Sequence, residues 1–268
     1  MEHQSPKYRS VFISDLHLGS KGAQADAVAD FLKHNTCEKL YLVGDIIDGW
    51  RLRKKWHWPQ AHTNVIRRIL TASKRGTDVT YLIGNHDEFL RAFLQFKPSF
   101  GRIKIRNRAI HDGEDGKRYL VVHGDMFDGM MRSDRKWLMF LGDSAYNGLL
   151  WANIRLNTVR RWLGLPYWSL SQALKKKTKR ALNYIHSFED HVAHYCKRKG
   201  FDGAICGHIH VAEMRDIDGI TYMNDGDWVE SCTALVEHHD GTWQLVEHKP
   251  DAITAPVVPI KTGALQAA

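Results

Sequence analysis

Short apolar runs recur through the first half of the chain and once more near residue 205. They are rich in β-branched and aromatic residues, which predicts buried β-strands rather than helices. The runs span residues 11–13, 40–43, 79–83, 119–122 and 204–206. Between them, residues 21–35 and 60–75 place apolar side chains at helical spacing. This alternation of strands and helices predicts a layered α/β fold.

Each apolar run is followed at once by a polar motif that carries a carboxylate, an amide or an imidazole. The motifs are Asp15-x-His17, Gly44-Asp45, Gly84-Asn85-His86-Asp87, His123-Gly124-Asp125 and Gly207-His208-x-His210. Binding sites in open α/β sheets form at the carboxyl ends of the strands. We therefore expect the polar side chains to meet in one site.

The candidate ligands are hard oxygens and imidazoles, without a thiolate. They are Asp15, His17, Asp45, Asn85, His123, His208 and His210. Imidazole suits Zn, Fe or Ni, whereas carboxylate and amide oxygens suit Mn or Mg. The mixed set indicates two divalent cations, which lie about 3.5–4 Å apart in two-metal sites and ionise a shared water for attack on phosphorus. Asp45 is the natural bridge, because one carboxylate has two oxygens.

In this order the motifs resemble those of the calcineurin-like metallophosphoesterase superfamily, over about residues 9–240. The resemblance implies an α/β fold built as a four-layer sandwich, with two mixed sheets flanked by helices and an inserted helical cap. For the first metal it implies the ligands Asp15, His17, Asp45 and His210. For the second metal it implies Asp45, Asn85, His123 and His208. His86 resembles the histidine that faces the phosphate and assists the leaving group, and Asp87 would orient it.

The chain also resembles the bacterial UDP-2,3-diacylglucosamine diphosphatase family of lipid A synthesis. The shared features are residues 13–18, Trp50, Phe89-Leu90 and Gly226-Asp227-Trp228. The better-known branch of that family has Arg in place of His86, Phe in place of Glu88 and Phe-Glu in place of Ile47-Asp48. The resemblance implies cleavage of UDP-2,3-diacylglucosamine to UMP and the lipid 1-phosphate. It implies Mn²⁺ as the metal, with Fe, Zn or Mg as alternatives.

Basic and aromatic residues near the motifs are candidate substrate contacts. Trp50, Arg51 and Arg53 begin an aromatic and basic segment, residues 50–59, which we expect to be a loop. Indole rings stack on bases and cations, and arginine pairs with phosphate. The remaining candidates are Lys177, in a basic run, and Asp227 and Trp228, in a loop where the resembling family contacts its headgroup. The alternative for the two basic segments is an ordinary solvated surface.

Residues 126–199 have few strand signals and many helix formers, including a long helix from Leu170 to His194. We interpret 126–199 as a helical cap inserted into one domain of residues 1–250. Its apolar residues either pack together or form an acyl-chain groove or a membrane-resting patch. Residues 251–268 lack periodicity and are expected to be a flexible tail.

The 268-residue chain has a net charge of +8, which favours phosphate-rich partners without choosing among nucleotides, nucleic acids and anionic lipids. Its four scattered cysteines indicate reduced thiols in the cytoplasm. Residues 1–9 are too polar for a signal peptide, and no apolar run reaches the ~18 residues of a membrane span. We expect a cytoplasmic enzyme, with peripheral contact to the inner membrane as a further expectation.

The sequence therefore predicts a dinuclear-metal phosphohydrolase acting on a phosphorylated, lipid-linked nucleotide, without a stable nucleic-acid partner. The alternative is a phosphodiesterase or phosphomonoesterase acting on a nucleotide or another phosphorylated metabolite. A nuclease is suggested by basicity alone. A non-catalytic scaffold would lack ligands or the phosphate-facing histidine, and here the full set is present.

Overall fold

The computed structural model describes residues 7–96, 99–128, 155–160, 162–163 and 179–248. The chain divides into two compact units, one formed by Met1–Gly124 with Ala193–Ala268 and the other by Asp125–Val192. Most of the predicted cap and the whole predicted tail lie outside the described residues. Both remain predictions.

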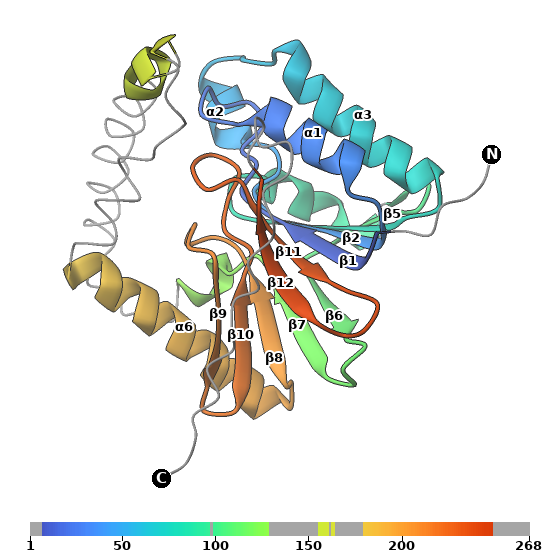
Figure 1. The fold of residues 1–268 in the computed structure, drawn as a ribbon, viewed down its shortest axis with the longest axis vertical. Helices are drawn as coiled ribbons and strands as arrows, with labels where there is room; N and C mark the ends of the chain where they lie inside the picture. Colours follow the sequence, from blue (N-terminus) through green and yellow to red (C-terminus); the bar gives the residue numbers. More distant parts are fainter. Residues whose placement is uncertain (1–6, 97–98, 129–154, 161, 164–178, 249–268) are drawn as a thin grey trace. The chain divides into compact units, whose positions relative to one another are not determined.

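Two sheets form the framework of the larger unit (Figure 1). The first has seven strands in the order β12-β11-β1-β2-β3-β5-β4. Its parallel strands are β1 (Tyr8–Ile13), β2 (Cys37–Val43), β3 (Asp78–Leu82) and β5 (Ile103–Arg106). Its antiparallel strands are β4 (Ser99–Phe100), β11 (Thr233–Glu237) and β12 (Trp243–Glu247). β11 and β12 form a hairpin that turns at residues 238–241.

The second sheet has five strands in the order β6-β7-β8-β10-β9. Its parallel strands are β7 (Arg118–Val122), β8 (Gly203–Cys206) and β10 (Ile220–Asn224). Its antiparallel strands are β6 (Arg108–Asp112) and β9 (Glu213–Ile217). Both sheets are therefore mixed, as the resemblance implied.

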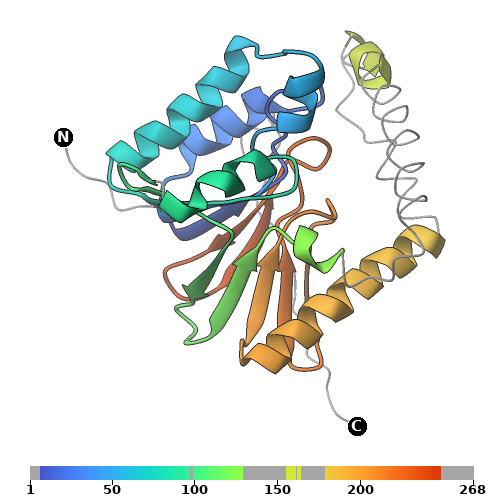
Figure 2. The same ribbon diagram turned by 180° about the vertical axis from the view of Figure 1, so that it is seen from behind.

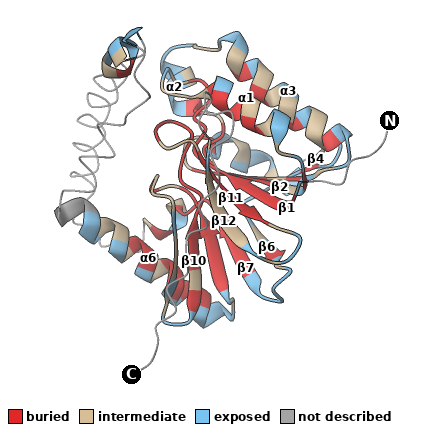
Figure 3. Cartoon of the chain, in the orientation of Figure 1, coloured by how far each residue is buried: buried red, intermediate tan, exposed pale blue. Residues whose placement is uncertain are grey.

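The central strands of the first sheet, β11, β1, β2 and β3, are largely buried on both faces (Figure 3). Along β1, Val11 and Ile13 pack in the core beneath the helices, while Phe12 packs in the core shared with the second sheet. Phe12 stacks on Tyr41 of β2 with ring centroids 4.6 Å apart. A strand that is buried on both sides reads as a continuous apolar run. This is why the runs in the sequence show no polar alternation.

Helices cover the outer faces of the two sheets (Figure 2). α1 (Ala25–His34) and α3 (Gln60–Lys74) lie on the first sheet, close to the ranges predicted from helical spacing. α6 (Lys179–Lys199) contributes its last turns to the larger unit, where Cys196 Sγ donates to the Gly203 carbonyl at 3.6 Å. In the smaller unit, the Tyr184 hydroxyl donates to Asp128 at 3.1 Å. The larger unit is thus layered as helix, sheet, sheet and helix.

Three short helices follow strand ends: α2 (Gly49–Lys54) and the 3₁₀ segments η1 (Glu88–Phe96) and η2 (Asp125–Phe127). α2 occupies the start of the segment expected to be a loop. The Asp48 carboxylate caps this helix by accepting the Arg51 N–H at 2.9 Å. An aspartate at this position favours the start of a helix, which explains why these residues are helical and not a loop. Among the described residues, no helix combines the length and the apolar character needed to cross a bilayer.

Candidate metal centre

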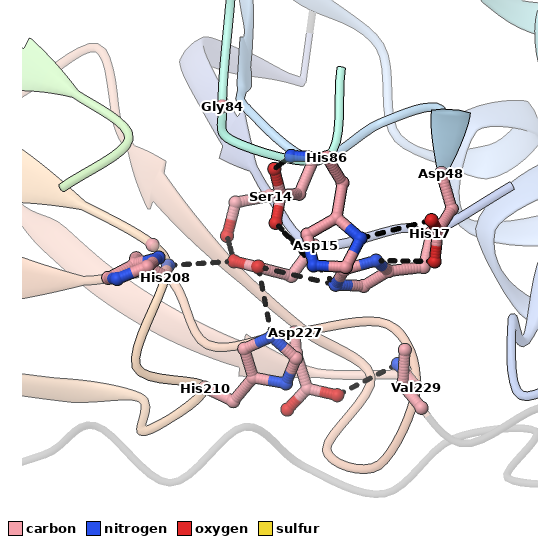
Figure 4. Close-up of polar contacts among 12 residues, drawn as sticks. Ser14, Asp15, His17, Asp48, Gly84, His86, His208, His210, Asp227 and Val229 are labelled. Atoms are coloured by element: carbon pink, nitrogen blue, oxygen red, sulfur yellow. Dashed lines mark hydrogen bonds and ion pairs between the residues drawn. The ribbon is translucent and has the colours of Figure 1, made fainter. Parts of the chain in front are cut away.

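The predicted ligands lie in loops at the carboxyl ends of strands from both sheets (Figure 4). β1 leads into Asp15 and His17, and β2 leads into Asp45. From the second sheet, β7 leads into His123 and β8 leads into the histidine pair. Because the two sheets pack face to face, these loops meet although their residues are up to 195 positions apart.

The loops hold a strained backbone. The residues Asp15, His17, Asp45, His208 and His210 all have φ between 47° and 71°. Residues other than glycine rarely adopt this left-handed backbone conformation. Where several such residues occur together, the surrounding structure maintains the strain, and such clusters are typical of functional sites. Gly207 makes the approach possible, because a Cβ at that position would overlap the Ser14 side chain and the Asp15 carboxylate.

One group of ligand atoms surrounds Asp15. Its Oδ1 lies 2.9 Å from His210 Nε2 and 3.6 Å from His17 Nε2. This oxygen is buried and accepts no hydrogen bond of acceptable geometry, whereas Oδ2 accepts from Ser14 Oγ and the His208 N–H. A buried carboxylate oxygen facing two imidazole nitrogens without a hydrogen bond fits a cation ligand.

A second group surrounds His123. Its Nε2 lies 3.2 Å from Asn85 Oδ1, and its ring centroid lies 5.0 Å from that of His208. Its Nδ1 lies 2.9 Å from the Val43 carbonyl oxygen. A carbonyl accepts only from a protonated nitrogen, so in the neutral ring Nδ1 carries the proton and Nε2 is the nitrogen that can bind a metal.

Asp45 lies between the two groups. Its Oδ2 is 3.4 Å from His123 Nε2 and 3.8 Å from His17 Nε2. Its Oδ1 accepts the His86 backbone N–H at 2.8 Å, and a Cβ on Gly84 would overlap that same oxygen. One oxygen is thus held by the backbone while the other faces both groups. This is the placement expected of a bridging carboxylate.

The electrostatics of the cluster favour a bound positive charge. Burial alone would lower the pKa of His17, but the nearby carboxylates of Asp15, Asp48 and Asp45 outweigh burial and raise this pKa to about 10. Burial would raise the pKa of Asp45, yet the neighbouring His123 and His17 lower it. Protonated imidazoles here take the place of the cation that the carboxylates attract. The residues therefore fit divalent metal ions.

His86 lies beside the metal centre but is held by a different partner from the one predicted. Its Nδ1 is 3.0 Å from Asp48 Oδ1, and its Nε2 is 3.9 Å from Asp45 Oδ2. Asp87 was expected to orient this ring. Instead, the Asp87 carboxylate accepts from Tyr81 Oη at 2.6 Å and from two backbone N–H groups, Gly84 at 2.6 Å and Ile46 at 3.0 Å. Asp87 is the next residue along the chain, but its side chain points inward and joins two loops, so Asp48 takes the orienting position.

The basic and aromatic candidates lie beside His86. The Trp50 ring centroid is 4.2 Å from that of His86, and its Nε1 donates to Glu88 Oε1 at 3.2 Å. A pocket of about 480 Å³ opens there, lined by Gly49, Trp50, Leu52, Arg53, Trp56, His86, Glu88 and Phe89. Arg51 is exposed on α2 and is not part of that lining. Lys177 lies outside the described residues.

Asp227 and Trp228 do not form an exposed rim as expected. Trp228 is fully buried in the core and packs against Phe31 at a ring-centroid distance of 5.2 Å. Asp227 is also fully buried, and its Oδ1 accepts the Val229 N–H at 2.8 Å and the Glu230 N–H at 2.5 Å. The aromatic ring completes the core under α1, and the carboxylate shapes the turn. Their backbone still touches the site, because the Trp228 N–H donates to the Asp15 carbonyl at 3.2 Å.

Three side chains of the site had no role assigned from the sequence. Asp48 stands in the motif Gly44-Asp45-x-x-Asp48, and its position three residues after a ligand was the available signal. Ser14 and Asp225 hydrogen-bond to each other at 2.6 Å, although 211 residues separate them in the chain. A pair of residues so far apart in the chain cannot be predicted from a local sequence pattern.

Comparison with known proteins agrees with this geometry. The family model described as calcineurin-like phosphoesterase matches residues 8–212. The UDP-2,3-diacylglucosamine hydrolase of Porphyromonas gingivalis is 24% identical, covering 90% of this chain and 97% of that protein. Its namesake from Aliivibrio fischeri is 25% identical, covering 90% and 98%. The solved structure of a phosphoesterase from E. coli aligns at 14% identity with a TM-score of 0.41, covering 90% and 99%.

The family match spans more than half of the chain and includes every loop that supplies a candidate ligand. The chain therefore belongs to the calcineurin-like phosphoesterase family and is a metal-dependent hydrolase of phosphoric esters.

Proposed function

We propose that this enzyme cleaves the pyrophosphate of UDP-2,3-diacylglucosamine, releasing UMP and the lipid 1-phosphate, with two divalent cations. The proposed ligands are Asp15, His17, Asp45, Asn85, His123, His208 and His210. The observation that carries the proposal is the position of the Asp45 carboxylate between the two groups of ligand atoms. When bound, divalent cations lower the pKa of water and neutralise phosphate charge. We propose Mn²⁺ as the native metal.

In this proposal His86 donates a proton to the oxygen of the leaving group. The hydrogen bond to Asp48 engages Nδ1 and directs Nε2 toward Asp45. The His86 side chain is 23% exposed, so an incoming phosphate can reach it. A histidine positioned within reach of the leaving group is an effective general acid. Asp48 is then the residue that positions it.

The pocket beside His86 supports a substrate with an apolar part. Its lining includes the side chains of Trp50, Leu52, Trp56 and Phe89, with Arg53 as a basic group. A volume of about 480 Å³ lies within the range typical of ligand sites. A lipid-linked nucleotide presents both an apolar chain and a phosphate, which match these two features. The two curated relatives carry the name of the same hydrolase.

Exposed aromatic and basic residues in the two chain segments that supply the pocket lining support contact with the cytoplasmic face of the inner membrane. Trp56, Phe93 and Phe96 are 73%, 53% and 72% exposed. Lys54 and Lys55 are exposed nearby in the sequence. Aromatic side chains favour the headgroup region of bilayers, and lysines are attracted to anionic lipid.

The second candidate is a phosphodiesterase for a nucleotide or another phosphorylated metabolite. It is favoured by the exposed indole of Trp50, which lies directly beside His86 and can stack on a base. The two candidates differ in what the pocket binds, an acyl chain or a heterocycle.

The decisive experiment compares three substrates on purified protein loaded with manganese. They are UDP-2,3-diacylglucosamine, its deacylated form and a nitrophenyl phosphodiester. The lipid proposal predicts that kcat/KM for the diacyl substrate exceeds that for the deacylated one by at least about tenfold, since burial of each CH₂ contributes about 0.8 kcal/mol. Equal cleavage of the acylated and deacylated forms would contradict it and favour the second candidate.

A variant of the pocket sharpens the test. Phe89→Ala should raise KM for the diacyl substrate and leave hydrolysis of the small nitrophenyl diester within about twofold, because that diester does not need the pocket. Leu70→Ala, a half-exposed apolar residue of α3 outside the pocket lining, is the matched control. If both variants affect the diacyl substrate equally, the pocket is not the lipid site.

A further inference from the structure

Ser14 links two carboxylates at the back of the metal centre. Its Oγ lies 2.6 Å from Asp15 Oδ2 and 2.6 Å from Asp225 Oδ1. A third acceptor, the Gly226 carbonyl oxygen, lies at 3.2 Å. A serine hydroxyl has one proton to donate and lone pairs to accept with. One hydroxyl cannot donate to two ionised carboxylates, so one of the carboxyl groups must donate to the serine.

Asp15 is the acceptor of the two. Its Oδ2 already accepts the His208 N–H at 2.9 Å, which leaves this oxygen placed to accept rather than to donate. Its Oδ1 faces the imidazoles of His17 and His210. An ionised carboxylate is therefore stabilised here from both sides.

Asp225 is the donor. Its side chain is fully buried, and its Oδ2 is buried without a hydrogen-bond partner. No salt bridge from a basic group reaches it among the described residues, whereas Asp15 places a negative charge close by. Burial raises the pKa of the Asp225 carboxyl well above its ordinary value and outweighs the hydrogen bond with Ser14, which lowers it. The Asp15 charge adds to the effect of burial, and the nearby His123 opposes it. An ionised group would leave a buried charge unpaired, which is far more costly than a neutral one.

We propose that Asp225 is a neutral, protonated carboxyl group that donates to Ser14, and that Ser14 in turn donates to Asp15. This relay makes Asp225 a positioning residue for a metal ligand, and the inference rests on the proposed metal centre. With Oδ2 held by Ser14 and by the His208 N–H, Asp15 has one carboxylate orientation, and its Oδ1 faces the other ligands. The proton on Asp225 also prevents a further negative charge from accumulating behind the site.

The relay joins two loops that are distant in sequence. Asp225 follows β10, and its backbone carbonyl accepts from Thr233 Oγ1 at 2.8 Å. Asp15 follows β1, and its carbonyl accepts the Trp228 N–H at 3.2 Å. Ordering of Asp15 is thus shared between backbone contacts and the side-chain relay, and substitution can separate the two contributions.

The test compares Asp225→Asn with Asp225→Ala. An asparagine amide can donate to Ser14 as the protonated acid does, so metal affinity should stay within about threefold of the unaltered protein. Alanine removes the donor, and affinity should fall by about 10–100-fold, the usual effect of losing a group that orients a metal ligand. The measurement is competition with a chelator for manganese, without any substrate. If asparagine weakens binding as much as alanine does, the negative charge of Asp225 is needed and the proposal is wrong.

Thr233→Val is the matched control, because it removes the hydrogen bond to the Asp225 carbonyl and leaves the relay intact. Its metal affinity should stay within about threefold of the unaltered protein. A loss as large as that of Asp225→Ala would show that loop structure, not the relay, sets the affinity, and would overturn the proposal.

Infrared spectroscopy of the metal-free protein tests the proton directly. The difference spectrum between the unaltered protein and Asp225→Asn should contain the C=O stretch of a protonated carboxyl group at neutral pH. A carboxylate band in its place would overturn the proposal. This readout needs neither metal nor the Asp225→Ala variant. If the protein bound no manganese but showed the band, the proposed metal centre would be wrong and the protonation of Asp225 would still hold.

Discussion

The protein has two buried polar clusters at different levels along β1. Beyond the carboxyl end of the strand lies the metal centre around Asp15 and Asp45. Within the strand, Ser10 belongs to a cluster around Glu237 of β11. Both clusters contain buried carboxylates and buried imidazoles. They differ in whether every buried polar atom has a hydrogen-bond partner within the protein.

Every polar atom at the end of the Glu237 side chain has a partner. Oε1 accepts from Arg9 Nη1 at 2.6 Å and from the Glu114 N–H at 2.8 Å. Oε2 accepts from Ser10 Oγ at 2.8 Å and contacts His111 Nε2 at 2.9 Å. The other His111 nitrogen lies 3.2 Å from Tyr41 Oη. This cluster fastens the two sheets together and requires no ligand.

The metal centre is incomplete by the same criterion. Asp15 Oδ1 is buried without a hydrogen bond, and the ligands there adopt the left-handed backbone conformation that the Glu237 cluster avoids. Buried polar groups are normally satisfied, so a buried oxygen that faces imidazoles without a hydrogen bond fits a cation ligand. A buried polar cluster in which every polar atom has a partner within the protein is structural. A cluster that includes a buried polar atom without such a partner is a candidate binding site.

The largest expected difference between the clusters comes from Asp45→Ala. Both proposed metals share this ligand, and metal ions contribute several kcal/mol to transition-state stabilisation, so nitrophenyl diester hydrolysis should fall by about 10⁴-fold or more. Metal content, measured by elemental analysis, should fall with it. Retained activity would contradict the bridging role.

His86→Gln should separate catalysis from metal binding within the open cluster. Loss of a general acid lowers turnover by about 10²–10⁴-fold, and metal content should remain that of the unaltered protein. Elemental analysis beside steady-state kinetics makes the distinction. A large loss of metal would instead make His86 a ligand.

Glu237→Gln should destabilise the fold and spare metal binding. Burial would raise the pKa of Glu237, but hydrogen bonds from His111, the Glu114 N–H and Arg9 outweigh burial and lower it to about 2. The carboxylate therefore contributes stability above pH ~4.5, on the order of 3 kcal/mol, and this is lost as the pH falls from 4.5 through about 2. Urea unfolding at pH 7 and pH 3 measures both effects.

Glu114→Gln is the control for that experiment. Glu114 also pairs with Arg9, at 3.0 Å, but its side chain is 52% exposed. Exposed ion pairs contribute at most about 1 kcal/mol, so this variant should lose little stability. Equal losses in the two variants would show that the Glu237 cluster has no special role.

Asp48→Asn should have the smallest effect. Asparagine caps helices as well as aspartate does, so α2 and the free energy of unfolding should change little. The charge that orients His86 is removed, and turnover should fall by about tenfold. An unchanged kcat would leave Asp48 as a helix cap only, and a second comparison with Asp48→Ala would then show the cost of losing the cap.

Local sequence determined much of this protein. Apolar runs such as 40–43 specify strands because both of their faces are buried, and helical spacing specifies α1 and α3 because one face of each must pack. The motifs after the strands predicted the ligand set of the proposed metal centre, because ligand chemistry is a property of side chains.

Only the tertiary structure decided which neighbours those side chains have. The family resemblance implied Asp87 as the partner of His86, but the Asp87 side chain points inward to Tyr81, and Asp48 contacts the ring. Trp228 became core and Asp225 met Ser14, because packing of the two sheets sets which distant loops share a space. The chemistry of each side chain follows from its own residue type. Its burial and its hydrogen-bond partners are set only when strands that are distant in sequence pack together.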